Sequence, residues 1–172
     1  MPSTPPRFYG KYRGSVINTA DPSQIGRIQV QVSDITGYKP STWAMPCVPV
    51  AGIHAGIFVV PSIGSQVWVE FEQGNPDYPI WTGGFWSSAA EVPPSAAVSP
   101  YPNIVLQTTS QNSVVIGDAA PTSTSGGIVL KSANGAMIVV NDTGIYINNG
   151  KGAEITLLGA TVDINKGGFT VA

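Results

Sequence analysis

The feature that most constrains this chain is a recurring pair of apolar residues separated by one position, found throughout the part after residue 103. Such a pair places both side chains on one face of a β-strand, because successive side chains of a strand point to opposite faces. The pairs are Ile104/Leu106, Val114/Ile116, Ile128/Leu130, Ile138/Val140, Ile145/Ile147, Ile155/Leu157, Val162/Ile164 and Phe169/Val171.

The spacing of these pairs is regular. From residue 128 they begin 10, 7, 10, 7 and 7 residues apart, so that positions 128, 145 and 162 are 17 apart. Glycines lie between the pairs, where a positive φ would ease a corner: Gly135, Gly144, Gly152, Gly159 and Gly167. The pattern predicts stacked short strands, as in a β-solenoid or a β-prism. Eight strands at about 4.8 Å each would form a shaft of about 40 Å.

One such chain has nothing to cover its own apolar stripe. Several chains around a common axis would bury it, and each inward residue would then contribute roughly 1.5–3 kcal/mol. A single-chain solenoid is the alternative, although its coils usually have about 20 or more residues.

Composition supports an all-β protein. Only 10% of the residues are charged, and 20 Gly and 15 Pro disfavour long helices. A hydrophobic content of 42% argues against a disordered chain.

The first 86 residues predict a small β-barrel. Expected strands are residues 12–18, residues 27–33 with Ile28, Val30 and Val32 on one face, a short edge segment around Pro46, residues 65–71 and residues 78–86. In "SQVWVEF" and the Glu72 that follows it, Val67, Val69 and Phe71 share a face opposite Trp68, Glu70 and Glu72. Five strands in this length fit a barrel of the OB type.

Two motifs in this region resemble the OB domain of contractile-injection spikes, a family that includes phage baseplate spikes (baseplate assembly protein V) and VgrG-type spikes. One motif runs through Pro61, Gly64, Val67, Val69, Phe71, Gly74, Pro76, Pro79 and Gly83; the other is "GRIQVQV" at residues 26–32, after Asp21 and Pro22.

The resemblance implies an OB barrel followed by a C-terminal intertwined triple-stranded β-helix in a homotrimer. The trimer core it implies consists of Ile128, Leu130, Ile138, Val140, Ile145, Ile147, Ile155, Leu157, Val162 and Ile164. Residues 1–86 would form the OB domain with a short N-terminal arm, residues 87–103 an extended Pro/Ala/Ser-rich linker, and residues 104–172 the spike. The linker has no room for the lysozyme domain that some phage spikes carry there.

No residue pattern predicts catalysis, so we expect no enzyme activity. His54 lies in a Gly/Ala-rich loop, no nucleophile motif is present, and Cys47 lies among apolar residues, where a buried, inert thiol is expected. A Cys47/His54 pair is the remaining catalytic alternative. No cofactor or metal is expected: the iron-binding tips of some phage spikes need a His-x-His near the C-terminus, and this tail has no histidine.

The resemblance also implies partners at both ends. A separate hub protein would bind the N-terminal OB end, and a PAAR-type tip protein would cover the C-terminal end. We expect the hub to contact Arg7, Lys11 and Arg13, the densest charges in the chain, and the tip protein to bind Gly167, Gly168, Phe169, Thr170, Val171 and Ala172. The target membrane would be met transiently on piercing. The start of the chain has no apolar signal core, so we expect assembly in the bacterial cytoplasm into a virion tail or injection-particle baseplate.

Two other functions remain as alternatives. A trimeric fibre or adhesin that binds glycans would share the C-terminal part but would not explain the two OB motifs. An OB-fold nucleic-acid-binding protein would need a basic groove, whereas residues 1–86 have five basic and five acidic residues; we expect no nucleic-acid partner.

Overall fold

The computed structural model describes residues 6–97, 103–119 and 126–171 of the 172-residue chain. The chain divides into two compact units, Met1–Ala89 and Ala90–Ala172.

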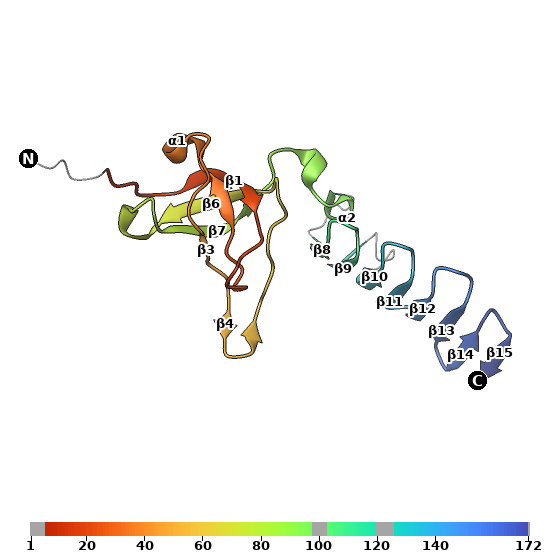
Figure 1. The fold of residues 1–172 in the computed structure, drawn as a ribbon. Helices are drawn as coiled ribbons and strands as arrows, with labels where there is room; N and C mark the ends of the chain where they lie inside the picture. Colours follow the sequence, from red (N-terminus) through yellow and green to blue (C-terminus); the bar gives the residue numbers. More distant parts are fainter. Residues whose placement is uncertain (1–5, 98–102, 120–125, 172) are drawn as a thin grey trace, which may run out of the picture. The chain divides into compact units, whose positions relative to one another are not determined.

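The described part of the first unit, residues 6–89, is built mainly from strands joined by loops and short helical turns (Figure 1). The strands are β1 (Tyr12–Asn18), β2 (Gln29–Gln31), β3 (Met45–Pro46), β4 (Ala51–Gly52), β5 (Ala55–Gly56), β6 (Gln66–Phe71) and β7 (Pro79–Phe85). A one-turn helix, α1 (Ser33–Thr36), follows β2, and a 3₁₀ turn, η1 (Glu72–Gly74), joins β6 to β7. The expected strand at residues 12–18 is therefore found with those bounds.

Five of these strands form one curled sheet in the order β2-β1-β6-β7-β3. All neighbours are antiparallel except β3 and β7, which run parallel. The sheet closes where Ile28 pairs with Ala44: their backbone N–H groups each donate to the other's carbonyl, at 3.2 and 2.8 Å. This closed five-stranded order is that of an OB-type barrel.

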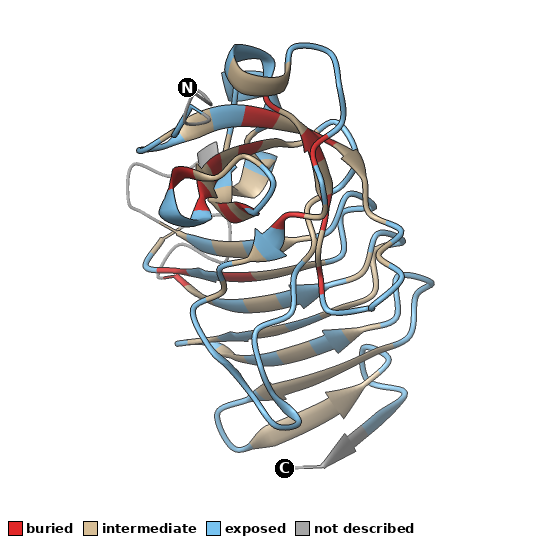
Figure 2. Ribbon diagram, turned by 60° about the vertical axis from the view of Figure 1, so that its left-hand side comes forward, coloured by how far each residue is buried: buried red, intermediate tan, exposed pale blue. Residues whose placement is uncertain are grey.

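The barrel encloses its own hydrophobic core. The faces predicted by alternation point inward as expected: Ile28, Val30 and Val32 are fully buried, as are Val67 and Val69 of β6. The remaining core members are Val16, Ala44, Phe71 and Trp81. In Figure 2 the buried residues gather in this barrel.

The connector predicted to be extended contains two helical turns where the structure describes it. These are η2 (Ala89–Glu91) and α2 (Pro94–Ala97). Proline at the first helical position explains α2, because its fixed φ suits a helix start and it needs no intrahelical hydrogen-bond partner. The Asn103 side-chain amide donates to the Ser95 carbonyl at 3.1 Å.

The second unit contains one eight-stranded antiparallel sheet in which every strand pairs with its neighbours in sequence (Figure 1). The strands are β8 (Ile104–Gln107), β9 (Ser113–Gly117), β10 (Gly127–Lys131), β11 (Met137–Asn141), β12 (Gly144–Asn148), β13 (Glu154–Leu158), β14 (Thr161–Ile164) and β15 (Phe169–Val171). This meander confirms the predicted repeat of short strands. The expected corners all have positive φ: Gly135, Gly144, Gly152, Gly159 and Gly167.

The predicted class is confirmed: the protein is all-β, with an OB-type barrel followed by a strand-rich C-terminal region. The strands of that region bond to one another within a single chain. Intertwining of three chains into a triple-stranded β-helix therefore stays a prediction.

Candidate functional site: surfaces for assembly

One candidate surface is a two-column ladder of apolar side chains on one face of the C-terminal sheet. The registers align the first column through Ile104, Ile116, Ile128, Val140, Ile145, Leu157 and Val162. They align the second column through Leu106, Val114, Leu130, Ile138, Ile147, Ile155, Ile164 and Phe169. We call these residues the apolar ladder.

The apolar ladder is open in the single chain. All ten residues predicted to form the trimer core lie on it, and the structure brings them together as adjacent rungs. Six of them are exposed, from 37% at Ile145 to 44% at Leu130. The other four, Ile155, Leu157, Val162 and Ile164, are half-buried. Figure 2 shows the contrast with the barrel: strands β10 to β14 have only intermediate and exposed residues.

The ladder also extends beyond the predicted set. Ile104 and Leu106 of β8 are more exposed than any predicted member, at 63% and 67%, and the rungs of β9 continue the same face. The same i, i+2 spacing could have placed them in the set.

The opposite face of this sheet has a different composition. Its central column begins with Val105, Val115, Val129, Val139 and Tyr146, and then becomes polar at Thr156 and Asp163. Apolar residues are thus continuous in two columns on the ladder face but stop partway in one column here. The ladder is therefore the face that most needs a partner.

The three cations predicted to bind a hub are each held against the barrel. Lys11 Nζ lies 2.8 Å from Glu70 Oε1 and donates to Thr82 Oγ1 at 3.0 Å. The Arg13 guanidinium lies over the rings of Trp68 and Phe85, with centroid distances of 5.4 and 5.0 Å.

Arg7 makes a separate contact just beyond the C-terminal end of β6. Its guanidinium donates to the Gln73 carbonyl at 3.3 Å. The structure therefore places Lys11 and Arg13 on a shared outer face over β6, because they are two positions apart at the start of β1, and it places Arg7 by η1. A role in hub binding stays a prediction.

The predicted tip segment is partly described. The backbone N–H of Gly167 donates to Asp163 Oδ1 at 2.8 Å, and Phe169, whose side chain is 61% exposed, begins β15. Strand β15 pairs with β14 through Thr170 and Val171, and Gly168 lies in the turn before it. Ala172 lies outside the described residues.

One expectation about chemistry is wrong. Cys47 is exposed, not buried. Side chains alternate along β3, with Ala44 inside the barrel and Met45 outside, so that Cys47 also falls on the outer side. His54 lies at the far end of the segment that follows, in the turn between β4 and β5.

The strongest electrostatic perturbation lies in the β1–β2 loop. Asp21 accepts hydrogen bonds from Arg27 Nε and Nη2 at 2.9 and 2.7 Å, and from the backbone N–H groups of Ser23, Ile25 and Arg27. The Arg27 side chain, followed by those backbone donors, holds the pKa of Asp21 well below its usual range although partial burial opposes the shift. Because Arg27 also lies over Trp43, this network fixes the loop.

Within the ranges that the structure describes, no group of three or more His, Cys, Asp and Glu residues is arranged to hold a metal ion. No helix in the described part of the chain is long and apolar enough to cross a membrane.

The fold and its surfaces define a class: a β-barrel protein that presents a second, open sheet for assembly. Comparison with known families gives the same division. Residues 12–86 match the type VI secretion system/phage-baseplate injector OB domain, and residues 103–170 match the phage baseplate V C-terminal trimerisation domain. No curated protein matched the chain.

The two matches are consecutive, belong to one architecture and together cover most of the chain. This protein belongs to the phage baseplate V family. It is a structural protein of the baseplate or spike type, and its trimerisation domain supports a homotrimer.

Proposed function

We propose that this protein is the trimeric central spike of a contractile injection machine, such as a phage tail or tailocin, and that it pierces the target envelope when the sheath contracts. The observation that carries the proposal is the apolar ladder, which runs across all eight strands of the C-terminal sheet and stays open in one chain. Such a function is mechanical, so it depends on the stiffness and shape of the protein and not on an active site.

Three copies can satisfy the ladder if each turns it toward a common axis. The polar part of the opposite face near the C-terminal end of the sheet, with Thr156 and Asp163, would then point outward to water. Because the sheet's internal strands already have both hydrogen-bonding edges paired within the chain, side-chain packing along the ladder is the main source of association energy. A β-prism in which each chain contributes one such sheet is an arrangement that meets this condition.

The two ends of such a spike need different partners. A separate hub protein would hold the barrel, with Arg13 the best placed of the predicted cations because Lys11 already has Glu70 as its ion-pair partner. A PAAR-type protein would cover the C-terminal end, where the exposed ring of Phe169 would be presented three times. Assembly would occur in the bacterial cytoplasm before the particle acts on a target membrane.

Mass measurement by light scattering tests the trimer. We expect three times the chain mass of 17.9 kDa at micromolar concentration. A folded particle of 17.9 kDa would overturn the proposed spike.

A pull-down with hub and PAAR-type proteins from the same gene cluster tests the partners. Truncation after Asn165 should leave strands β8 to β14 and the trimer intact but abolish capture of the PAAR-type protein. Lys166→Ala is the matched control, because its side chain is 82% exposed and should contribute little to docking. Capture of the cap by the truncated trimer would exclude C-terminal docking.

A further inference from the structure

A charge-free arm leaves the barrel between β3 and β6, with β4 and β5 as its paired strands (Figure 1). Residues 47–63 contain no Asp, Glu, Lys or Arg. Six of their large apolar side chains are instead exposed: Val50 57%, Ile53 91%, Ile57 52%, Phe58 70%, Val59 67% and Ile63 66%. Soluble proteins rarely leave so many apolar groups open on one segment unless the segment contacts a partner.

The tip of the arm is unusual for a hairpin turn. Gly52 pairs with Ala55, so that Ile53 and His54 form the two-residue connection. Such connections favour Asn-Gly or Gly because they require positive φ. Here His54 has a φ of +55°, and Ile53 is β-branched and almost fully exposed. The tip sequence is therefore poorly suited to making the turn and well suited to an apolar contact.

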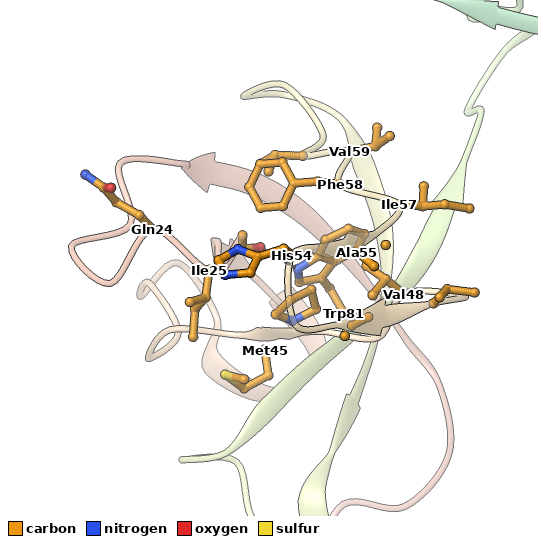
Figure 3. A pocket seen from close by; sticks show the side chains of 17 residues that line it. Gln24, Ile25, Met45, Val48, His54, Ala55, Ile57, Phe58, Val59 and Trp81 are labelled. Atoms are coloured by element: carbon orange, nitrogen blue, oxygen red, sulfur yellow. Dashed lines mark hydrogen bonds between the residues drawn. The ribbon is translucent and has the colours of Figure 1, made fainter.

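A hollow of about 590 Å³ lies between this arm and the barrel. Figure 3 shows its lining, in which Ile25 of the β1–β2 loop, Met45 of β3, Phe58 of the arm and Trp81 of β7 surround the space. Trp81 Nε1 already donates to the Gly26 carbonyl at 3.2 Å, so the indole offers its apolar ring to the hollow. No Asp, Glu, Lys or Arg lines it.

The chain thus has an exposed apolar arm tip at Ile53 and an apolar hollow. In this conformation the tip does not enter the hollow of its own chain. Residues 50–60 form one wall of the hollow, yet Ile53 is not among the residues that line it. Both surfaces lack charge, so a second copy of the same chain is a matched occupant.

We propose that Ile53 of one copy seats in the hollow of the next copy, so that the three barrels form a closed ring. The proposal rests on the homotrimer of the proposed function. A contact between two different patches closes into a ring when the copies are related by a threefold axis. Residues 47 to 53 can reach about 20 Å when extended, which is about two thirds of the roughly 30 Å width of a barrel of this length.

Single-cysteine chains test this contact. In a Cys47→Ser background, one chain carries Ile53→Cys and a second carries Met45→Cys, at the rim of the hollow. Both positions are exposed, as is Cys47, so the changes should leave the fold intact. After co-expression and mild oxidation, we expect a disulfide-linked dimer of the two chains on a non-reducing gel. The double variant should form a covalent trimer.

The matched control pairs Ile53→Cys with Tyr38→Cys, because Tyr38 is 94% exposed and lies away from the hollow lining. This pair should cross-link at most a tenth as much. Equal cross-linking of the control, linkage of Ile53→Cys chains to one another, or an intrachain disulfide in the double variant would each overturn the proposal.

Light scattering on the same samples separates the two levels of inference. A trimer by mass that lacks the linkage between positions 45 and 53 overturns the arm contact and leaves the spike intact, with a hub protein or an apolar ligand then left as the occupant. A monomer overturns both.

Discussion

Two strands with the same spacing of apolar residues differ in how deeply those residues are buried. Val67 and Val69 of β6 are fully buried inside the barrel, whereas Ile145 and Ile147 of β12 are 37% and 39% exposed on the C-terminal sheet. The barrel closes through the pairing of Ile28 with Ala44, so the side chains of its inner face pack against one another. The sheet never closes, so its apolar face stays available. Alternation therefore specifies which side chains share a face, and closure decides whether one chain can bury that face.

The largest expected effect is on the open sheet. Ile147→Asp places a carboxylate on the apolar ladder, where association would bury it without a partner, and threefold symmetry repeats it three times. We expect loss of the trimer and a particle of 17.9 kDa by light scattering.

The matched control for this variant is one residue away. Asn148→Asp lies on the opposite face of β12, and it keeps a side-chain oxygen to accept the Gly150 N–H, which lies at 2.6 Å from Asn148 Oδ1. It should remain trimeric. Loss of assembly in both variants would mean that the ladder face is not specifically responsible.

The second expected effect is confined to the barrel. Ile28→Ala truncates a fully buried side chain that belongs to the closing pair itself and should lower the free energy of unfolding by about 2–5 kcal/mol. Denaturant unfolding followed by tryptophan fluorescence measures this, and Ile63→Ala, at a 66% exposed position, is the control. The trimer should persist, since the ladder is unchanged. Dissociation of the trimer by Ile28→Ala would show that the two units are not independent.

Acid should affect the barrel through Asp21. Its folded pKa lies below the ordinary value of 3.8, so the unfolded chain binds the proton first as pH falls. The stabilisation is therefore complete at neutral pH and declines below about pH 4. The melting temperature of the barrel should exceed that of Asp21→Asn at pH 7, and the gap should narrow toward pH 2. A gap that does not change with pH would contradict this assignment.

The smallest effects are expected at surface ion pairs, one on each unit. Lys11 lies 2.8 Å from Glu70 on the barrel, and Lys166 lies 3.9 Å from Glu154 on the sheet. Such exposed pairs contribute about 0–1 kcal/mol, so Lys11→Ala and Lys166→Ala should each change unfolding free energy by less than about 1 kcal/mol. A larger loss at Lys11 would point to its hydrogen bond with Thr82.

Sequence periodicity predicted those parts of the fold that repeat or alternate. It located β1, the buried faces of β2 and β6, and every rung of the ladder. It failed where structure depends on a few residues: β4 and β5 are two residues each, too short for a period to show, and α2 is a single turn. The outward position of Cys47 follows from the register of β3, which pairing with β7 sets and local sequence does not.

The candidate surfaces were predicted unevenly for the same reason. Apolar pairs identify the ladder because every rung repeats the signal. The hollow between the arm and the barrel is lined by Ile25, Met45, Phe58 and Trp81, which come from four separate segments. No pattern of spacing in the sequence predicts that these residues lie together. Whether Arg7, Lys11 and Arg13 bind a hub depends on a second protein, which one sequence does not contain.

The meander also has a direction in which it is strong. Its strands lie across the length of the sheet, so the hydrogen bonds between neighbouring strands point along that length. Tension applied at the C-terminus would act first on β15, which pairs with β14 at only three residue positions. It would then separate the remaining strands one after another. Compression along the same line brings neighbouring rungs of the ladder together and is resisted by the repulsion of packed atoms. The sheet is consequently a strut that tolerates being pushed far better than being pulled.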